Sequence, residues 1–235
     1  MSCAGGPDLI QNGLVLCLDA ANRKSYSGSG TTWRDLSGNN NNGTLTNGPT
    51  FSSANGGSIV FDGVDDYIDL TNNTALNITT NDFTLEIFFY YQRSSYNYVK
   101  IASRGGYSQP GWTFYAGFNP SDSSDGTAFQ YGQTAQTWTS VPPNAKIITI
   151  DNWWHACATR LNGVIYFYTN GILIDSKIDS YNFNSSSNTI IGASLNGSTE
   201  RFKGRVACFR QYNRGLTPAE ILQNYNATKG RFLLT

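Results

Sequence analysis

The chain has 235 residues, and its 16 Lys and Arg balance its 16 Asp and Glu, so the formal net charge is zero. This balance argues against the basic surface that nucleic-acid binding or electrostatic membrane attachment requires. The composition, with 14% aromatic residues, 24 glycines and 39% hydrophobic residues, is typical of a turn-rich all-β protein with enough apolar side chains for a core. All-β sandwiches often reach this length undivided, so we expect one domain.

We expect neither a signal peptide nor a membrane span. The opening MSCAGGPD lacks a charged segment followed by an apolar one, and no apolar run approaches the roughly 18 residues of a transmembrane helix. The expected product is a soluble chain made in the cytoplasm. Cys3, Cys17, Cys157 and Cys208 are far apart, and the last three lie in apolar runs. We expect reduced core thiols, with a bridge between Cys17 and Cys208 as the alternative.

The first dozen residues differ from the rest of the chain. Residues 1–12 contain Gly5-Gly6-Pro7 and precede the first apolar run, so we predict an N-terminal arm that is ordered by a partner, followed by one domain over residues 13–235. Leu14–Leu18 is a nearly continuous apolar run, which predicts a buried strand. We expect this strand to pair near Val206–Tyr212, because exposed strand edges are disfavoured.

Residues 22–55 are rich in Gly, Ser, Thr and Asn. A free loop of that length is improbable in a compact domain. We therefore expect a long ordered loop that contains short strands near Gly43–Leu45 and Thr50–Phe51.

An acidic turn follows. Within the stretch Gly57–Leu70, two β-branched or aromatic runs flank Asp62-Gly63-Val64-Asp65-Asp66, which predicts a strand, a turn and a strand. The carboxylates of Asp62, Asp65 and Asp66 are candidate ligands for Ca²⁺, which prefers several oxygen ligands. The alternative is ordinary turn chemistry, since Asp favours turns and the sequence has no Asp-x-Asp-x-Asp-Gly loop pattern.

The clearest alternation of side chains lies in Phe83–Tyr91, where apolar residues occupy every second position. This period of two predicts a central strand. Glu86 lies on the other face of this strand, and we expect it to face solvent or to accept a hydrogen bond.

The segment from Arg93 to Ile147 is an aromatic insert, in which aromatic residues are spread among Gly, Ser, Gln and Pro. If several rings are exposed together in loops, they form a platform suited to a sugar or a protein surface. The alternative is that they fill the core of the sandwich. The candidate binding residues are Trp112, Trp138, Tyr107, Tyr115 and Tyr131.

Asn162-Gly163 and Asn170-Gly171 are strong two-residue hairpin signals. They predict a three-stranded meander over Trp153–Arg160, Val164–Thr169 and Ile172–Ser176. His155 is the only histidine, and the sequence around it contains no serine elbow and no second His or Cys cluster. We therefore expect no catalytic or metal-binding role for it.

A short helix is predicted near the C-terminus. Thr217, Pro218 and Glu220 match the N-cap, N1 and N3 positions of a capping box, and the helix is expected to run to about Tyr225. Glu220 is accounted for by this cap, so we assign it no catalytic role.

Three segments carry a family resemblance. "GGSIVFDGVDDYIDL", "DNWWHACATRLNGVIYFYTNGILI" and "FKGRVACFRQYNRGLTPAEI" resemble the opening, the central hairpin and the closing strand of laminin-G-like, concanavalin A-like jelly-roll domains. The resemblance covers about Gly13 to Ile221. It implies an all-β, antiparallel two-sheet jelly roll with one short C-terminal helix.

The glucanases of this fold carry catalytic acids as Glu-x-Asp-x-x-Glu along one strand. The corresponding run here, Glu86-Ile-Phe-Phe-Tyr-Tyr, lacks the second and third acids, so the carboxylate pair that glycoside hydrolysis needs is missing from this strand. We therefore expect a protein that is not an enzyme, with a glycoside hydrolase as the less favoured alternative.

The tail "ILQNYNATKGRFLLT" resembles the ends of structural proteins from tailed phages, especially those of marine cyanobacteria. This resemblance implies a virion protein, either a capsid decoration or a tail-associated module, with a role in surface or glycan adhesion. The alternative is a Ca²⁺-dependent lectin module. Expected partners are other virion proteins, a host-surface glycan and further copies of the chain, with the N-terminal arm on the particle and the aromatic insert facing outward.

Overall fold

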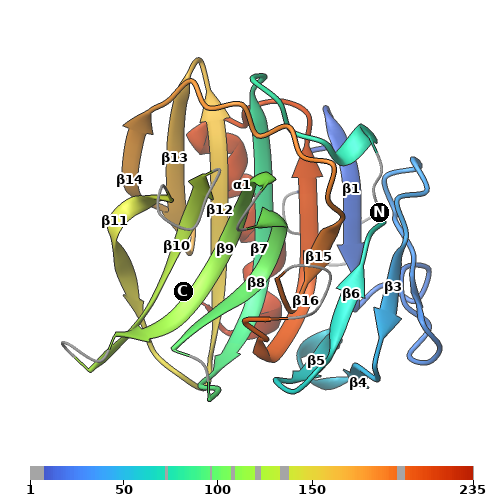
Figure 1. The fold of residues 1–235 in the computed structure, drawn as a ribbon. Coiled ribbons are helices and arrows are strands. Elements are labelled where there is room, and N and C mark those ends of the chain that lie inside the picture. Colours follow the sequence, from blue (N-terminus) through green and yellow to red (C-terminus); the bar gives the residue numbers. More distant parts are fainter. Residues whose placement is uncertain are drawn as a thin grey trace.

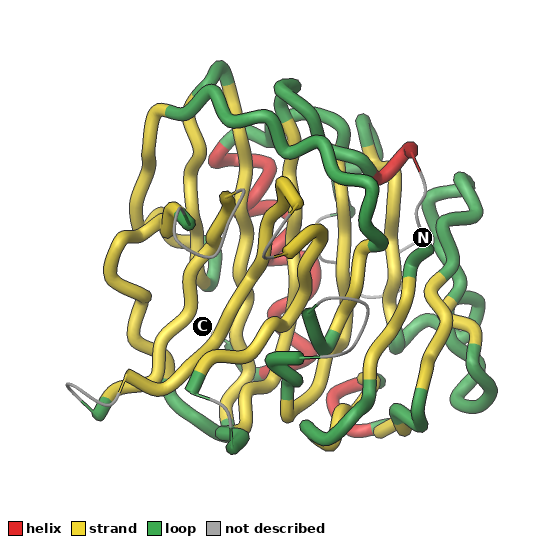
Figure 2. The backbone as a smooth tube through the Cα atoms, in the orientation of Figure 1, coloured by secondary structure: helices red, strands yellow, loops and turns green. Residues whose placement is uncertain are grey.

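The computed structural model describes residues 8–71, 74–95, 97–106, 109–119, 123–132, 138–194 and 199–234. Two antiparallel sheets pack face to face, and the C-terminal helix covers the far side of one of them (Figures 1 and 2). This is the two-sheet jelly roll expected from the sequence. None of the described helices is long and apolar enough to cross a membrane.

Sheet A is the rear sheet in Figure 1. Within the described residues its strands follow the order β14 (Ile172–Ile178), β13 (Val164–Thr169), β12 (Asn152–Leu161), β7 (Phe83–Gln92), β16 (Lys203–Tyr212), β5 (Ser58–Asp62) and β4 (Thr50–Ser52), and β1 (Leu14–Asp19) also pairs with β16.

Sheet B lies in front of it. Its described strands follow the order β11 (Thr139–Ile148), β10 (Ser124–Gly132), β9 (Gln109–Asn119), β8 (Tyr98–Gly106), β15 (Thr189–Ile191), β6 (Tyr67–Asp69), β3 (Gly43–Thr46) and β2 (Thr32–Trp33). The predicted short strands in the long polar loop are therefore confirmed as β3 and β4. Short 3₁₀ turns occur at Ala54–Gly56, Thr74–Leu76 and Gly230–Phe232.

The core lies between the sheets and follows from side-chain alternation. In β7, Leu85, Ile87 and Phe89 are buried against sheet B, while Phe88 belongs to a second apolar cluster on the outer side of sheet A. Successive side chains of a strand point to opposite faces, so β7 contributes to both clusters. The predicted central strand is confirmed by its pairing with both β12 and β16.

The first strand pairs with the last. Cys17 lies opposite Arg210 and Leu18 lies opposite Phe209 in the antiparallel ladder of β1 and β16. The predicted pairing of the terminal apolar runs is confirmed. Cys17, Cys157 and Cys208 are buried free thiols, and Cys3 lies outside the described residues.

The aromatic insert is not a set of loops. Residues 98–106, 109–119, 124–132 and 139–148 form β8 to β11, which make up half of sheet B. The expectation of a loop insert was wrong. Alternate residues of β9, such as Trp112, Phe114 and Ala116, are buried in the core, which agrees with the alternative that these side chains fill the sandwich, and the glycines lie within strands rather than between them.

The meander and the helix agree with the sequence. Asn162 and Asn170 adopt positive φ in the two hairpin turns, as type I′ turns require. Helix α1 (Pro218–Lys229) begins with the predicted capping box between Thr217 and Glu220, and it extends one turn beyond the predicted end. It packs on the outer face of sheet A through Ile221 and Tyr225.

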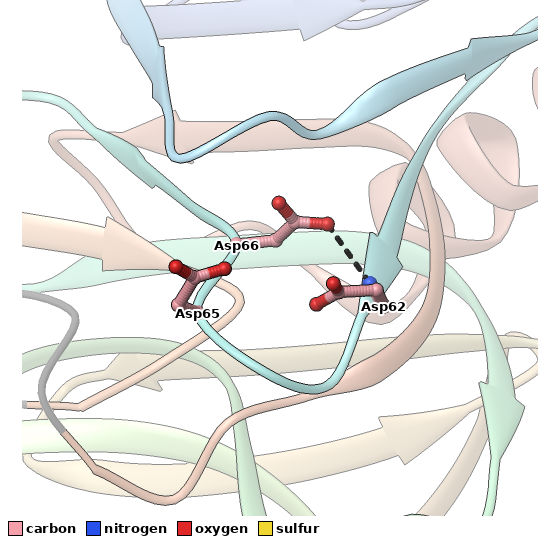
Figure 3. A group of neighbouring side chains, drawn as sticks. All are labelled: Asp62, Asp65 and Asp66. Atoms are coloured by element: carbon pink, nitrogen blue, oxygen red, sulfur yellow. Dashed lines mark hydrogen bonds between the residues drawn. The ribbon is translucent and has the colours of Figure 1, made fainter.

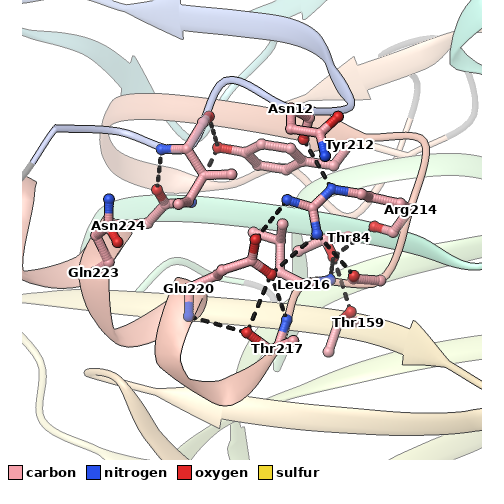
Figure 4. Close-up of polar contacts among 12 residues, drawn as sticks. Asn12, Thr84, Thr159, Tyr212, Arg214, Leu216, Thr217, Glu220, Gln223 and Asn224 are labelled. Carbon is pink, nitrogen blue, oxygen red and sulfur yellow. Dashed lines mark hydrogen bonds and ion pairs between the residues drawn. The ribbon is translucent and has the colours of Figure 1, made fainter.

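Part of the predicted N-terminal arm is held by the chain itself (Figure 4). The backbone N–H of Ile10 donates to Asn224 Oδ1 at 2.9 Å, and the Tyr212 hydroxyl donates to the Ile10 carbonyl at 3.0 Å. Arg214 Nε donates to the Asn12 carbonyl at 2.9 Å. Residues 8–12 therefore belong to the folded unit and are not a free arm, while residues 1–7 lie outside the described part.

Candidate functional site

A row of four residues crosses the outer face of sheet B. In the register of β8 to β11, Tyr98 lies opposite Gly117, Gly117 opposite Gly126, and Gly126 opposite Ile147. Residues opposite one another in a ladder present their side chains on the same face. The two glycines are buried and add no side chains to the middle of this row, between an aromatic side chain on β8 and an aliphatic one on β11.

This row is part of a groove of about 560 Å³. Its two walls are unusually open for large apolar side chains, since Tyr98 is 50% exposed and Ile147 is 63% exposed. The groove is lined by Tyr98, Tyr115, Gly117, Ser124, Gly126, Pro143, Asn144, Ala145 and Ile147.

The glycines are required by close packing across the strands. A Cβ atom on Gly126 would lie 2.6 Å from the Cβ of Ala145, and one on Gly117 would lie 2.3 Å from the carbonyl oxygen of Asn97. Any larger residue would push these strands apart and fill the groove floor. The local backbone thereby fixes the shape of the groove.

Tyr115 closes one side of the groove. Its ring is 5% exposed and meets the Tyr98 ring edge to face, with the centroids 5.9 Å apart. Burial raises the pKa of Tyr115 to about 12, so its phenol stays protonated at neutral pH. The pair presents apolar ring surface together with two hydroxyl groups.

Trp138 lies on the same sheet beside a buried cation. It is half-buried, and Lys100 Nζ lies 5.4 Å from the centre of its ring. Lys100 is opposite Tyr115 in the ladder, and its Nζ is 3.6 Å from Glu200 Oε1. Burial lowers the pKa of Lys100, and Glu200 opposes this effect. The charge of Lys100 is therefore largely matched within the chain.

The predicted aromatic platform is wrong for two of its members. Trp112 is fully buried and packs between Phe129 of sheet B and Phe209 of sheet A, with centroids 6.4 and 6.3 Å apart. Tyr131 is 2% exposed and donates to Asp179 Oδ2 at 2.6 Å. Both side chains face the core, so neither can stack on an external ligand.

The other three predicted binding residues differ in where they lie. Tyr115 lines the groove, Trp138 lies nearby on sheet B, and Tyr107 falls outside the described residues. The sequence analysis did not identify Tyr98 and Ile147 as groove walls. Alternation of side chains along each strand would separate the outward-facing Tyr98 and Tyr115 from the core residue Trp112. The row across the strands depends on the register between them, which the sequence does not reveal.

None of the three glutamates in the sequence lines the groove. Glu86 is 1% exposed beneath α1, with Oε1 2.9 Å from His155 Nε2 and Oε2 accepting from Arg210 at 3.1 Å. It accepts hydrogen bonds, but the expectation that it might face solvent was wrong. Glu200 is matched with Lys100, and Glu220 accepts from Thr217 and Arg214 at the helix cap.

The buried group around Glu86 is structural. Burial alone would raise the pKa of Glu86, but the Arg210 guanidinium and the hydrogen bond from His155 hold it below its usual value. Asn224 of α1 donates to Glu86 Oε2 at 3.2 Å. His155 is fully buried in this network.

The acidic turn brings three carboxylates together (Figure 3). Asp62, Asp65 and Asp66 each offer an oxygen within 4.8 Å of the others. Two oxygens already accept backbone hydrogen bonds, since Asp62 N–H donates to Asp66 Oδ2 at 2.9 Å and Val64 N–H donates to Asp62 Oδ1 at 2.7 Å. One carboxylate oxygen of each residue remains to meet a cation, so the cluster fits a Ca²⁺ ion that completes its shell with water or carbonyl oxygens.

The charges around this turn act in opposite directions. Burial and the neighbouring Asp62 and Asp65 carboxylates raise the pKa of Asp66 to about 6, as expected for crowded, partly buried acids. Lys203 lies directly opposite Asp62 in the ladder of β5 and β16 and supplies one positive charge on the same face. A bound cation would lower the pKa of Asp66 again, and it would compete with Lys203 for the carboxylates.

Comparison with known families identifies the fold. A family model described as the concanavalin A-like lectin/glucanases superfamily matches residues 62–222, which is more than half of the chain. The chain belongs to this superfamily. Comparison with curated proteins finds no match.

Solved structures agree with this assignment of the superfamily fold. Domain 4 of an extracellular arabinanase from Geobacillus stearothermophilus, solved with arabinotriose, has a TM-score of 0.67 and 17% identity over 90% of this chain and 98% of that one. The binding domain of Paraclostridial mosquitocidal protein 1 has a TM-score of 0.69 and 18% identity over 92% and 52%. The botulinum neurotoxin serotype D ligand-binding domain, solved with N-acetylneuraminic acid, has a TM-score of 0.68 and 13% identity over 92% and 51%.

This chain therefore spans about half the length of these toxin domains, and at such low identity the likeness concerns the fold. The lectin-like jelly roll predicted from the sequence is confirmed.

Proposed function

We propose that this chain is a non-catalytic carbohydrate-binding module and that the groove on the outer face of sheet B holds the sugar. The observation that carries the proposal is a groove in which the exposed Tyr98 ring, backed by Tyr115, is separated from the exposed Ile147 by two positions without side chains, Gly117 and Gly126. An exposed aromatic ring beside polar side chains is suited to a ligand that has both apolar and hydrogen-bonding surfaces.

The chemistry of the lining agrees with a saccharide. A sugar ring presents C–H groups that pack on aromatic faces and hydroxyl groups that need hydrogen-bond partners. The hydroxyl of Ser124, the amide of Asn144 and the two tyrosine hydroxyls supply such partners around the groove. Ligand sites usually combine apolar walls with a few polar groups in this way.

The comparisons support the proposal at the level of the fold. An arabinanase domain in complex with arabinotriose and a toxin domain in complex with N-acetylneuraminic acid share this architecture. Both are structures of the same fold with a saccharide present. A shared fold does not imply shared groove residues, so this support concerns the fold alone.

Our proposal that the module is not catalytic rests on the positions of the Asp and Glu residues relative to the groove. Hydrolysis of a glycosidic bond requires two carboxyl groups about 5 to 10 Å apart at the scissile bond. Of the described residues that line the groove, none is Asp or Glu. We expect no release of reducing ends from arabinan, β-glucan or bacterial polysaccharides, and release above the buffer rate would revive a hydrolase.

The test of binding is the variant Tyr98→Ala. Removing this wall should weaken saccharide binding roughly fivefold, since an aromatic contact contributes about 1 kcal/mol. Tyr166 is a half-buried tyrosine on β13 of the opposite sheet, so Tyr166→Ala is the matched control and should leave affinity unchanged. Calorimetry with an oligosaccharide panel measures both, and equal losses in the two variants would contradict the proposed site.

We also propose that the module is carried on a virion, where it touches other virion proteins and presents the groove to a host-surface glycan. The support is the resemblance of residues 221–235 to the ends of tailed-phage structural proteins. The described part of this segment packs on sheet A, and its Arg231 binds Asp19 at 2.8 Å, so the segment also has a role within the fold. Mass spectrometry of purified particles tests the proposal, which fails if the chain is absent from them.

A third proposal concerns the acidic turn. We propose that Asp62, Asp65 and Asp66 bind Ca²⁺ as a structural ion, supported by the convergence of their oxygens and by the crowding that raises the pKa of Asp66. Binding to the folded state alone must raise stability. Added Ca²⁺ should therefore raise the melting temperature of chelator-treated protein.

A further inference from the structure

We infer that the groove selects uncharged glycans over glycans that carry carboxylate or sulfate groups. This inference rests on the proposed carbohydrate-binding function and names the substrate class of the same site. It depends on the charges that the described residues place in and around the groove.

The lining itself carries no formal charge. Of the nine described lining residues, none is Lys, Arg, His, Asp or Glu. The polar side-chain groups of the lining are the hydroxyls of Tyr98, Tyr115 and Ser124 and the amide of Asn144. All of these are neutral dipoles, which suit hydroxyl groups and give an anion no counter-charge.

The charged residues next to the lining are directed elsewhere. Asp125 separates Ser124 from Gly126 in the chain, but it accepts from the Tyr91 hydroxyl at 3.2 Å and forms an ion pair with Arg93. Lys146 precedes Ile147 and lies opposite the buried Thr127, so alternation directs its side chain to the other face of β11.

The one lysine of the described part that lies next to Tyr115 in the ladder is already matched. Lys100 is 8% exposed, faces Glu200 across 3.6 Å and lies beneath Trp138. An anionic sugar would have to compete with Glu200 for this charge and would meet the negative field of that carboxylate. Lys100 therefore gives an acidic ligand no net advantage.

Desolvation then decides between the two ligand classes. An anion that loses water without gaining a counter-charge is disfavoured, whereas a hydroxyl group loses far less and recovers it through one hydrogen bond. Because the groove provides neutral donors and acceptors only, the same sugar skeleton should bind better without its charge.

The shape adds a constraint on the ligand. Adjacent strands lie about 4.8 Å apart, so β8 and β11, which carry the two walls, are separated by roughly 14 Å. The Tyr98 and Ile147 side chains occupy part of this width. The width that remains between these two side chains suits a single saccharide chain.

The test uses matched pairs of probes on the full chain. Galactotriose is compared with trigalacturonic acid, and the methyl ester of 3′-sialyllactose with 3′-sialyllactose itself, by calorimetry at neutral pH and 0.15 M salt, with arabinotriose as a further neutral probe. We expect the neutral member of a pair that binds to do so at least tenfold more tightly. Equal or tighter binding of the acidic member would overturn the inference and leave the proposed function standing. If neither neutral nor acidic saccharides bind, the proposed function itself fails.

A variant that adds a positive charge tests whether the preference for neutral glycans arises in the groove. Asn144 is exposed on the groove rim, and Asn144→Lys adds a cation there without disturbing a buried contact. The preference for the neutral member should fall at least threefold in this variant. The control Ser176→Lys adds the same charge on exposed β14 and should leave the preference unchanged. An unchanged preference in Asn144→Lys would place the bound sugar outside the groove and overturn the inference.

Discussion

At the residue scale, Trp112 and Tyr115 lie three positions apart in one strand, yet one belongs to the core and the other lines the groove. Both are aromatic residues of β9, but alternation directs Trp112 into the core and Tyr115 to the outer face. Their predicted grouping as one platform combined residues from two faces. Within this strand, alternation of side chains determines which residue faces the core and which lines the groove.

We predict that Trp112→Ala lowers the free energy of unfolding by about 3 to 5 kcal/mol, because it leaves a cavity between the two sheets. Tyr115→Ala should cost less and should weaken sugar binding. Urea unfolding followed by fluorescence measures the first effect. A loss below about 1 kcal/mol for Trp112→Ala would contradict its placement between Phe129 and Phe209.

The buried ion pair beneath α1 gives a second prediction at this scale. Glu86→Gln removes the charge that balances Arg210 while keeping the shape of the side chain. Leaving a buried cation without its partner costs about 3 to 5 kcal/mol. The double variant Glu86→Gln with Arg210→Met should recover part of that loss, and chemical unfolding of the three variants tests this. Additive losses would show that the two residues are not coupled.

At the element scale, local signals predicted the helix cap and the hairpin turns, and the pairing of the two terminal apolar runs was also predicted, but the strands of the aromatic insert were not. The capping box of α1 and the two Asn-Gly turns could be predicted because all their determinants lie within a few residues. The strands β8 to β11 were taken for loops because their glycines resemble turn residues. Those glycines are needed where neighbouring strands approach closely, as at Gly126 and Ala145, and that approach exists only in the folded sheet.

The cap of α1 leads to a prediction about pH. The hydrogen bond from Arg214, opposed by partial burial, lowers the pKa of Glu220 from 4.5 to about 2. A folded pKa below the unfolded one gives stability that is complete above about pH 4.5 and is lost as the pH falls toward 2. The melting temperatures of wild type and Glu220→Gln should therefore differ at pH 6 and converge near pH 2. A constant difference would contradict this assignment.

The acidic turn behaves in the opposite direction. The pKa of Asp66 is raised from 3.8 to about 6, so its ionised form disfavours folding above pH 6, and stability recovers as the pH falls below that value. Without Ca²⁺, Asp66→Asn should stabilise the protein at pH 8 by about 1 kcal/mol. With 1 mM Ca²⁺, wild type should gain stability and Asp66→Asn should not. If Ca²⁺ leaves the wild-type melting temperature unchanged, the turn is not a calcium site.

At the scale of the whole molecule, the two faces of the sandwich have different tasks. Helix α1, residues 8–12 and the 3₁₀ turn Gly230–Phe232 cover the outer face of sheet A with an apolar cluster and a buried ion pair. The outer face of sheet B instead carries the open groove. The chain thus closes one face with its own terminal segments and leaves a groove open on the other.

The central claim is that a saccharide binds in this groove, and backbone amide mapping by NMR tests it most directly. During titration with the neutral oligosaccharide that binds most tightly, the largest shift changes should fall on Gly117, Gly126 and Ile147. Tyr98→Ala should abolish these changes at the same ligand concentration. Largest changes at the Asp62–Asp66 turn, or on the outer face of sheet A, would contradict the claim.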